Sequence, residues 1–319
     1  MDDDMFTAPA PITSDKNYLS STEGRVKDYA RKALAENTWR GYEHDLEHFM
    51  DWGGSIPCSP DVIAAYIADH AGMLAVSTLT RRLAAINKAH EMKNYLSPTK
   101  DQKVRLVMRG IRREHTTQQK QAEPLLRDDL ISICAHMADD NKGKRDKALL
   151  LIGFSAALRR SELVALNIED IEFTPEGLIV NIRKSKTDQE AAGHKIAVPK
   201  AKSQGRVCPV QALQEWLDCI SSAQGALFRS FRKNHQVQEK RLSASAVSVI
   251  IKEHVEKIGL EPETFSAHSL RAGCISSLAQ IGIPEWKIMR QSRHKSYTVM
   301  MSYIRDARLF ENHPLDSLF

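Results

Sequence analysis

An almost uniformly apolar run, ALLLIGFSAAL at residues 148–158, most constrains how this chain can fold. It ends a segment, residues 142–157, for which the pattern predicts a helix. Because a helix that is apolar on all sides must be surrounded by other elements, we expect it to be buried. The run stops at Arg159, whose guanidinium should point toward whatever lies beside the core. Ser161 is expected to cap the next short helix, and a lone RxxE favours a structural ion pair between Arg159 and Glu162.

Composition limits the class of protein. The 319 residues suffice for two domains, and 42% hydrophobic with 27% charged residues is typical of a soluble globular protein. A net charge of +5 is compatible with nucleic acid as a partner, although many other proteins are equally basic. No window resembles a membrane helix or a secretion signal. The five cysteines are scattered and form no CxxC pair, which favours a cytoplasmic protein with reduced thiols and no metal site.

The first part of the chain predicts a small helical domain. We expect residues 1–22 to be disordered and residues 23–114 to form four helices, followed by a polar linker at 115–124. Ser59-Pro60 marks the start of the second helix, and Ser77 is expected to cap the third. The first helix has an apolar stripe, and Gly53-Gly54 stops it. This stripe consists of Trp39, Tyr42, Leu46, Phe49 and Met50.

The outer faces of these helices are cationic. Such a face is most often a solvated helix surface, and the alternative is a surface that follows DNA phosphates and displaces their counterions. We name six residues as DNA-binding candidates: Arg81, Arg82, Lys100, Lys103, Arg105 and Arg109.

The second domain, residues 125–319, combines helices with strands. The segments IEFTPEG and LIVNIRKSKTDQEAAGHKIAVP are rich in β-branched residues with polar turns, and they predict a three-stranded antiparallel sheet. The turn carries Arg183, Lys184 and Lys186. Such a turn is usually solvated, but its cations could also reach a DNA groove or a leaving oxygen. Residues 221–242 look irregular and basic, and Ser243 or Ser245 should start a further helix.

Residues 266–306 bring together side chains that are unusual for a core. His268 and Arg271, three residues apart, should share a helical face. His294 is expected at the end of the helix that Pro284 starts, or just beyond, and Tyr303 lies in a last helix. Each has a structural explanation alone: a hydrogen-bonded histidine, an ion-pair partner, a half-buried aromatic ring. Together they suit a site that binds a phosphodiester and attacks it with a phenolic oxygen.

Four motifs in this order carry a family resemblance: ALRRSELVAL, SKTDQEAAG, AHSLRAG and RHKSYTVMMSYI. The chain resembles the tyrosine recombinases, or phage integrase family, and its Cre-like branch most. The resemblance implies a mainly α fold with a small antiparallel sheet. It comprises an N-terminal four-helix, SAM-like core-binding domain and an α+β catalytic domain with the DNA breaking-rejoining fold. Two departures stand out, since Ala156-Ala157 replaces the family's Thr-Gly, and Ser292-Arg293 replaces Leu-Gly.

The chemistry of the residues and the resemblance assign roles. Guanidinium groups are planar forks that stay charged, so Arg159 and Arg271 suit a phosphate clamp. Tyr303 is the expected nucleophile, because the family's spacing favours it over Tyr297. His268 is the candidate to accept the tyrosine's proton, His294 to bind the phosphate and Glu162 to orient the basic groups. The resemblance also implies that Lys186 protonates the leaving 5′-oxygen, that a 3′-phosphotyrosine bond forms, and that neither metal, ATP nor another cofactor takes part.

The resemblance further implies a site-specific recombinase that acts as a homotetramer on two double-stranded DNA sites. The C-terminal tail should dock on a neighbouring subunit, the alternative being its own domain. Its apolar residues are Leu309, Phe310, Leu315, Leu318 and Phe319. Two other functions remain open: a type IB-like relaxing topoisomerase, which the compact two-domain layout disfavours, and a non-catalytic DNA-binding protein, which the intact set of site residues disfavours.

Overall fold

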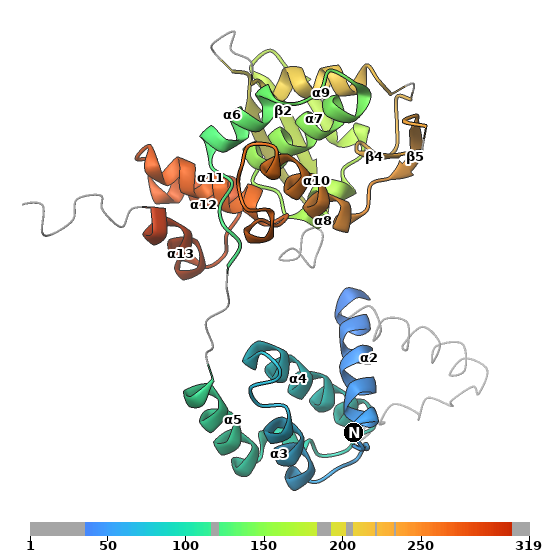
Figure 1. The fold of residues 1–319 in the computed structure, drawn as a ribbon, viewed down its shortest axis with the longest axis vertical. Helices are drawn as coiled ribbons and strands as arrows, with labels where there is room; N and C mark the ends of the chain where they lie inside the picture. Colours follow the sequence, from blue (N-terminus) through green and yellow to red (C-terminus); the bar gives the residue numbers. More distant parts are fainter. Residues whose placement is uncertain are drawn as a thin grey trace, which may run out of the picture. The chain divides into compact units, whose positions relative to one another are not determined.

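The computed structural model describes residues 36–115, 121–183, 193–201, 207–220, 222–232 and 234–307 (Figure 1). The chain divides into two compact units, Met1–Lys120 and Gln121–Phe319. This boundary falls within residues 115–124, although the functional division into domains stays a prediction. In the described part of the chain, no helix combines the length and apolar character needed to cross a membrane.

The first unit is helical, as expected. Ser59 caps its second helix by accepting a hydrogen bond from the Val62 amide at 3.5 Å. The expectation for Ser77 was wrong, because that helix already begins at Val76. The elements are α2 (Glu36–Asp51), α3 (Pro60–Asp69), α4 (Val76–Met92), the 3-10 turn η1 (Pro98–Lys100) and α5 (Gln102–Glu114).

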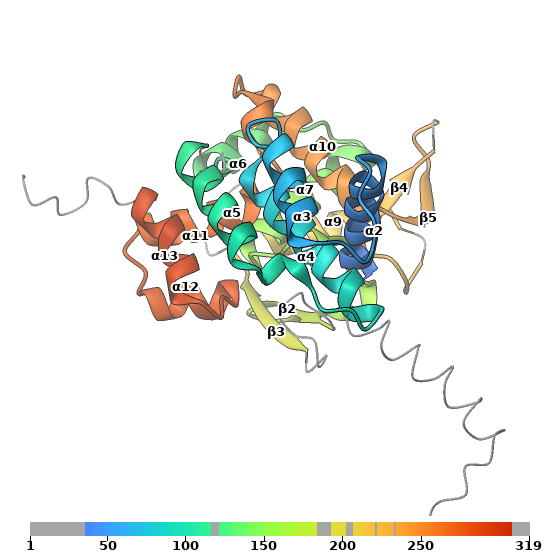
Figure 2. The ribbon, with the colours of Figure 1, turned by 90° about the horizontal axis from the view of Figure 1, so that it is seen from below.

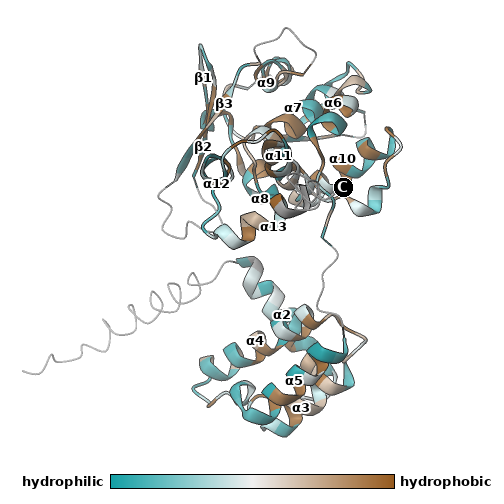
Figure 3. Ribbon diagram, turned by 90° about the vertical axis from the view of Figure 1, so that its left-hand side faces the viewer, coloured by the Kyte–Doolittle hydropathy of each residue, from teal (hydrophilic) through white to brown (hydrophobic). Residues whose placement is uncertain are grey.

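One apolar core joins these helices. Phe49 of α2, Tyr66 of α3 and Ile86 of α4 are fully buried in it, and Met108 of α5 completes it. Met50 was expected in the stripe, yet its side chain is 51% exposed. Successive helical residues point about 100° apart, so Met50 cannot share the direction of Phe49. In Figure 3, α5 carries both apolar brown and polar teal segments, consistent with one buried face.

The second unit is built around α7, whose apolar run is buried as expected. Leu149, Leu150 and Ile152, in the apolar second half of α7, are fully buried. The helices of this unit are α6 (Arg127–Ala135), α7 (Asn141–Ser155), α8 (Arg160–Ala165), α9 (Pro209–Leu217), α10 (Ala244–Glu256), α11 (Ser269–Gln280), α12 (Glu285–Ser292) and α13 (Tyr297–Ala307), with the 3-10 turns η2 (Ile168–Asp170) and η3 (Pro262–Thr264).

The predicted antiparallel sheet is present. Its order is β1 (Ile171–Thr174), β2 (Gly177–Ile182) and β3 (His194–Pro199), and Val180 pairs with Ile171 on one side and Ile196 on the other. Figure 2 shows β2 and β3 side by side.

Two local expectations in this unit were wrong. Ser161 does not cap α8, because that helix begins one residue earlier, at Arg160. A second, two-stranded sheet, β4 (Arg229–Phe231) with β5 (Val237–Arg241), occupies the stretch expected to be irregular. The residues VQEKR of β5 do not alternate apolar and polar side chains, so they give little strand signal.

A separate small core holds the C-terminal helices together. Ile275 and Ala279 of α11, Ile288 of α12, and Met300 and Ile304 of α13 are buried against one another. Figures 1 and 2 both show α12 and α13 beside α11. This core holds α13, which carries Tyr303, against α11, which begins directly after His268.

Candidate active site

The second unit brings six of the predicted site residues together. Arg159 precedes α8 and Glu162 lies in its first turn, while His268 precedes α11. The turn between α12 and α13 contributes His294. Arg271 on α11 and Tyr303 on α13 complete the set. Lys186 and Lys184 lie outside the described residues.

Arg159 and Glu162 form the expected ion pair. Arg159 Nη1 donates to Glu162 Oε1 at 2.7 Å, and the Arg159 amide donates to Oε2 at 3.0 Å. The Arg159 side chain remains 21% exposed, whereas that of Glu162 is 2% exposed. Burial pushes the pKa of Glu162 upward, but nearby Arg293 and the hydrogen bonds from Arg159 outweigh it and hold the pKa below its usual value. The carboxylate therefore anchors a guanidinium that still reaches the surface.

Arg271 is the most buried of the three described arginines at the site. It is 1% exposed, and its Nη1 donates to the Ala157 carbonyl at 2.6 Å. Its Nη2 lies 3.4 Å from Nε2 of His294. Burial, together with Arg159 and Arg293, lowers the pKa of Arg271 to about 10. The Arg271 guanidinium thus stays charged at neutral pH, even though the guanidinium groups of Arg159 and Arg293 lie close by.

His268 and Tyr303 are in direct contact. Nε2 of His268 lies 2.6 Å from the Tyr303 hydroxyl. Burial raises the pKa of Tyr303, although Arg271 and Arg159 oppose that rise. Burial also lowers the pKa of His268, and the same two arginines add to this effect, even though the residue keeps a solvent-exposed side. At neutral pH the contact therefore joins a neutral phenol to a neutral imidazole, a pair that can share a proton.

His294 lies between Arg271 and Tyr303. Its Nδ1 is 2.8 Å from the hydroxyl of Ser292, and its ring centroid is 5.8 Å from that of Tyr303. Burial, followed by Arg271 and Arg159, lowers the pKa of His294 to about 4. At neutral pH this side chain is an uncharged hydrogen-bonding group.

The rival tyrosine makes different contacts. The Tyr297 hydroxyl donates to the Glu285 carboxylate, and the side chain is 51% exposed. It lines a surface groove that also includes Trp286 and Met289. The geometry at His268 therefore favours Tyr303.

Arg293 was expected only to depart from the family's glycine, and no role was predicted for it. The structure places its side chain, 7% exposed, with Nη1 3.1 Å from Glu162 Oε2. Its Nη2 donates to the Ala157 carbonyl at 3.1 Å. Both Ala157 and Arg293 have left-handed backbones, with φ of 45° and 57°. A charged residue at a helix end where glycine is usual is a signal that could have identified it.

The DNA-binding candidates differ in accessibility. The expectation that Arg82 faces outward was wrong, since it is 5% exposed and donates to the Tyr66 hydroxyl at 2.9 Å. Arg81 is half-exposed but gives two 2.8 Å hydrogen bonds to the Asp45 carboxylate. Arg183 donates to Asp170 at 2.5 Å and remains 60% exposed. The candidates on and before α5 are exposed: Lys100, Lys103, Arg105 and Arg109.

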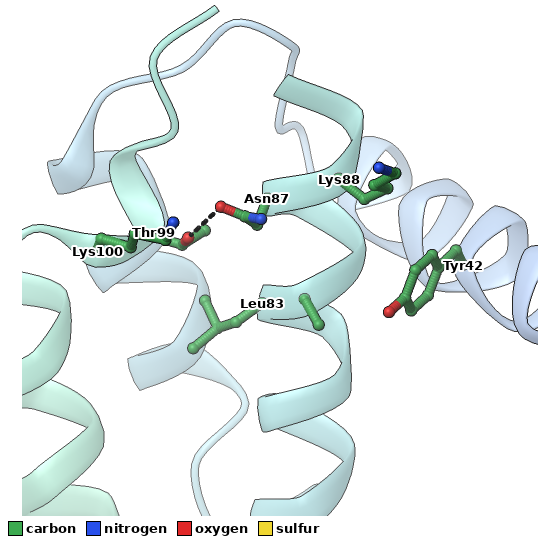
Figure 4. A pocket seen from close by; sticks show the side chains of 7 residues that line it. Tyr42, Leu83, Asn87, Lys88, Thr99 and Lys100 are labelled. Atoms are coloured by element: carbon green, nitrogen blue, oxygen red, sulfur yellow. Dashed lines mark hydrogen bonds between the residues drawn. The ribbon is translucent and has the colours of Figure 1, made fainter. Parts of the chain in front are cut away.

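A shallow groove in the first unit adds polar groups beside Lys100. Tyr42 of α2 and Asn87 and Lys88 of α4 line it, with Thr99 and Lys100 of η1 (Figure 4). The Thr99 hydroxyl donates to the Asn87 side-chain oxygen at 3.3 Å. The groove thus combines two lysines, a phenol and an amide. Within the described residues, no group of three or more His, Cys, Asp or Glu side chains could hold a metal ion.

A family model, curated relatives and solved structures can be compared with this fold. The Phage integrase family model matches residues 123–309. The integrase/recombinase xerD homolog of Selenomonas ruminantium is 37% identical over 305 residues, covering 92% of this chain and 89% of its own. Recombinase cre of Escherichia phage P1 is 26% identical over 301 residues, covering 86% of each chain.

Solved structures show the same fold. The Tn1549 transposon integrase in complex with circular intermediate DNA superimposes with a TM-score of 0.63, at 17% identity over 92% of this chain and 95% of the other. A lambda integrase dimer bound to a COC′ core site gives 0.59, at 15% identity over 94% and 79%. The family model and the curated relatives define an enzyme of the tyrosine recombinase class, which cleaves and rejoins DNA. The chain belongs to the phage integrase family.

Proposed function

We propose that Tyr303 is the nucleophile of this recombinase. Its oxygen forms a bond to the scissile phosphorus, the bond from phosphorus to the 5′-oxygen breaks, and a 3′-phosphotyrosine results. The 5′-hydroxyl of a partner duplex then attacks that phosphorus and releases Tyr303. The observation that carries the proposal is the 2.6 Å contact between the Tyr303 hydroxyl and His268 Nε2, next to buried Arg271. In this scheme His268 takes the phenolic proton during attack and returns it afterwards.

Arg159 and Arg271 are proposed as the phosphate clamp. Negative charge grows on the non-bridging oxygens as the tyrosine adds, and preorganised donors directed at that charge contribute roughly 3 kcal/mol each. Glu162 fixes Arg159 through a 2.7 Å hydrogen bond, and the Ala157 carbonyl fixes Arg271 at 2.6 Å. His294, uncharged at neutral pH, is proposed to donate one hydrogen bond to the same phosphate.

Lys186 is proposed to protonate the leaving 5′-oxygen. The residue lies outside the described part of the chain, so this role depends on the motif alone. A substrate with sulfur at the bridging 5′ position tests it, because a thiol is far more acidic than an alcohol (a pKa of about 8.5 for the cysteine thiol), so the thiolate leaves without a proton. Lys186→Ala should cleave the oxygen substrate slowly and the sulfur substrate at the wild-type rate. An equal defect on both substrates would remove Lys186 from this role.

DNA is the partner of this enzyme, and the exposed cations of the first unit are proposed to bind its phosphates. Lys100, Lys103, Arg105 and Arg109 lie on or next to one helix, and the groove of Figure 4 extends this surface toward Tyr42 and Lys88. Lys103 already pairs with Asp61, so its contribution should be smaller than that of Arg109.

The assembly is proposed to be a homotetramer on two DNA sites, in the cytoplasm, with exchanged C-terminal tails. The groove of Trp286, Met289 and Tyr297 offers an apolar surface, since Trp286 is 61% exposed. Deleting residues 309–319 should leave single-site DNA binding intact and abolish assembly on paired sites, measured by size-exclusion chromatography with light scattering. An intact tetramer without the tail would refute the exchange.

Covalent trapping tests the proposed function. A nicked suicide substrate that carries the recombination site should give a protein–DNA adduct on a denaturing gel with wild type and with Tyr297→Phe, the matched control, and none with Tyr303→Phe. An undiminished adduct with Tyr303→Phe would overturn the proposal. Exchange between two plasmids then separates recombination from simple relaxation.

A further inference from the structure

A third arginine, Arg293, contacts the groups that hold the two clamp arginines, Arg159 and Arg271. Arg293 follows α12 and adopts a left-handed backbone with φ of 57° and ψ of 39°. Left-handed backbone disfavours residues with a Cβ, so the conformation is unfavourable for arginine and natural for glycine. The long side chain nevertheless turns inward and is only 7% exposed. Burying a guanidinium in a strained backbone position requires compensating interactions.

Those interactions lead to both clamp arginines. Arg293 Nη1 lies 3.1 Å from Glu162 Oε2, and the other carboxylate oxygen holds Arg159 at 2.7 Å. Arg293 Nη2 donates at 3.1 Å to the Ala157 carbonyl, which also accepts the 2.6 Å hydrogen bond from Arg271. One guanidinium therefore contacts the two acceptors that separately orient Arg159 and Arg271.

Direct contact between Arg293 and a DNA phosphate is disfavoured by its burial. Its Nε and Nη1 atoms are inaccessible to solvent and lack a hydrogen bond of good geometry, and its Nη2 is used by Ala157. Nη1 faces the Glu162 carboxylate as an ion pair. Any hydrogen-bonded effect of Arg293 on the phosphate must therefore pass through its neighbours.

We propose that Arg293 is a positioning residue that couples Arg159 to Arg271, by bridging the Glu162 carboxylate and the Ala157 carbonyl. The bridge holds the two guanidiniums at a fixed separation before DNA arrives, so the clamp does not have to be ordered during the reaction. This inference rests on the proposed function, because it assigns a support to the proposed clamp.

The decisive variant is Arg293→Gly, which relieves the left-handed backbone while removing the bridge. Adduct formation by the full chain on the nicked suicide substrate, in a single turnover, should slow at least tenfold (~1.4 kcal/mol). The melting temperature should fall by a few degrees, because Glu162 loses one partner of a buried ion pair while Arg159 remains and the backbone strain is relieved. The affinity for the site should stay close to wild type. Arg293→Lys keeps the charge but lacks the fork of donors. Its rate of adduct formation should therefore lie between those of wild type and Arg293→Gly. His235→Gly, at an exposed position of this unit that also has positive φ, is the control for adding a glycine.

A neutral scissile linkage separates positioning from general damage. With a methylphosphonate in place of the phosphate, less negative charge develops, so the clamp contributes less and the Arg293→Gly defect should shrink to threefold or less. A wild-type rate for Arg293→Gly, or an equal defect on both linkages, overturns the inference. If Arg293→Gly fails to fold, the same comparison is made with Arg293→Lys. An adduct with Tyr303→Phe in the parallel lane would instead refute the proposed function itself.

Discussion

Glu162 is a buried carboxylate that lies among three arginines, so removing its charge probes the whole site. Its side chain is 2% exposed, it accepts hydrogen bonds from Arg159 at 2.7 and 3.0 Å, and Arg293 lies 3.1 Å away. Glu162→Gln keeps the shape of the side chain but leaves Arg159, Arg271 and Arg293 without this counter-charge.

The expected loss of stability is large for one substitution. Removing one partner of a buried ion pair costs roughly 3–5 kcal/mol, and we expect about 3 because glutamine still accepts a hydrogen bond. For a unit of the size of Gln121–Phe319, each kcal/mol lowers Tm by about 2–4 °C, so the shift is about 6–12 °C. Glu256→Gln, at an exposed position of α10, is the control and should change stability by less than about 0.5 kcal/mol.

The pH dependence gives the sharper readout. The folded-state pKa of Glu162 lies below its ordinary value of 4.5, so its stabilisation is complete above that value and lost as the pH falls through the folded pKa. Calorimetry should therefore show the full difference in the free energy of unfolding between wild type and Glu162→Gln at pH 7. That difference should shrink below about pH 4. A difference that is absent, or equally large at both pH values, would refute the assignment of Glu162 as the charged anchor.

Three further predictions follow from the same structure. NMR titration of the imidazole should find His294 neutral down to a pH of about 4, and a midpoint above 6 would contradict its burial beside Arg271. Met300 of α13 is buried in the small C-terminal core, so Met300→Ala should lower the free energy of unfolding by about 2–5 kcal/mol and reduce adduct formation. Val299→Ala, at a half-exposed position of the same helix, should change neither. Arg82→Ala should destabilise the first unit by about 3 kcal/mol without changing the salt dependence of DNA binding. Arg109→Ala should instead leave stability unchanged and reduce the salt slope by about 1, and the reverse pattern would show that the two arginines had been assigned wrongly.

Much of the fold could be predicted from local patterns. The apolar run before Arg159 required a buried helix, and β-branched segments with polar turns required the three-stranded sheet. The hairpin of β4 and β5 was missed because its short strands are mostly polar. Their pairing, Phe231 with Val237, depends on tertiary contacts that periodicity does not encode.

The candidate site could be predicted only in part, for a related reason. Spacing along the chain identified Arg159, His268, Arg271 and Tyr303, but it could not say which atoms meet. Arg82 looked outward by helical position, yet its stem and charge are buried against Asp45 and Tyr66. Arg293 was overlooked because its effect arises from a left-handed turn that aims the side chain inward, which no spacing rule predicts.

Locating the covalent bond tests the central claim most directly. Trypsin should release the adduct as residues 296–305, SYTVMMSYIR, a single peptide that contains both Tyr297 and Tyr303. After nuclease digestion, fragmentation in a mass spectrometer assigns the remaining nucleotide to one tyrosine. The contact with His268 predicts that it is found on Tyr303. A nucleotide on Tyr297, or on any residue outside this peptide, would contradict the account.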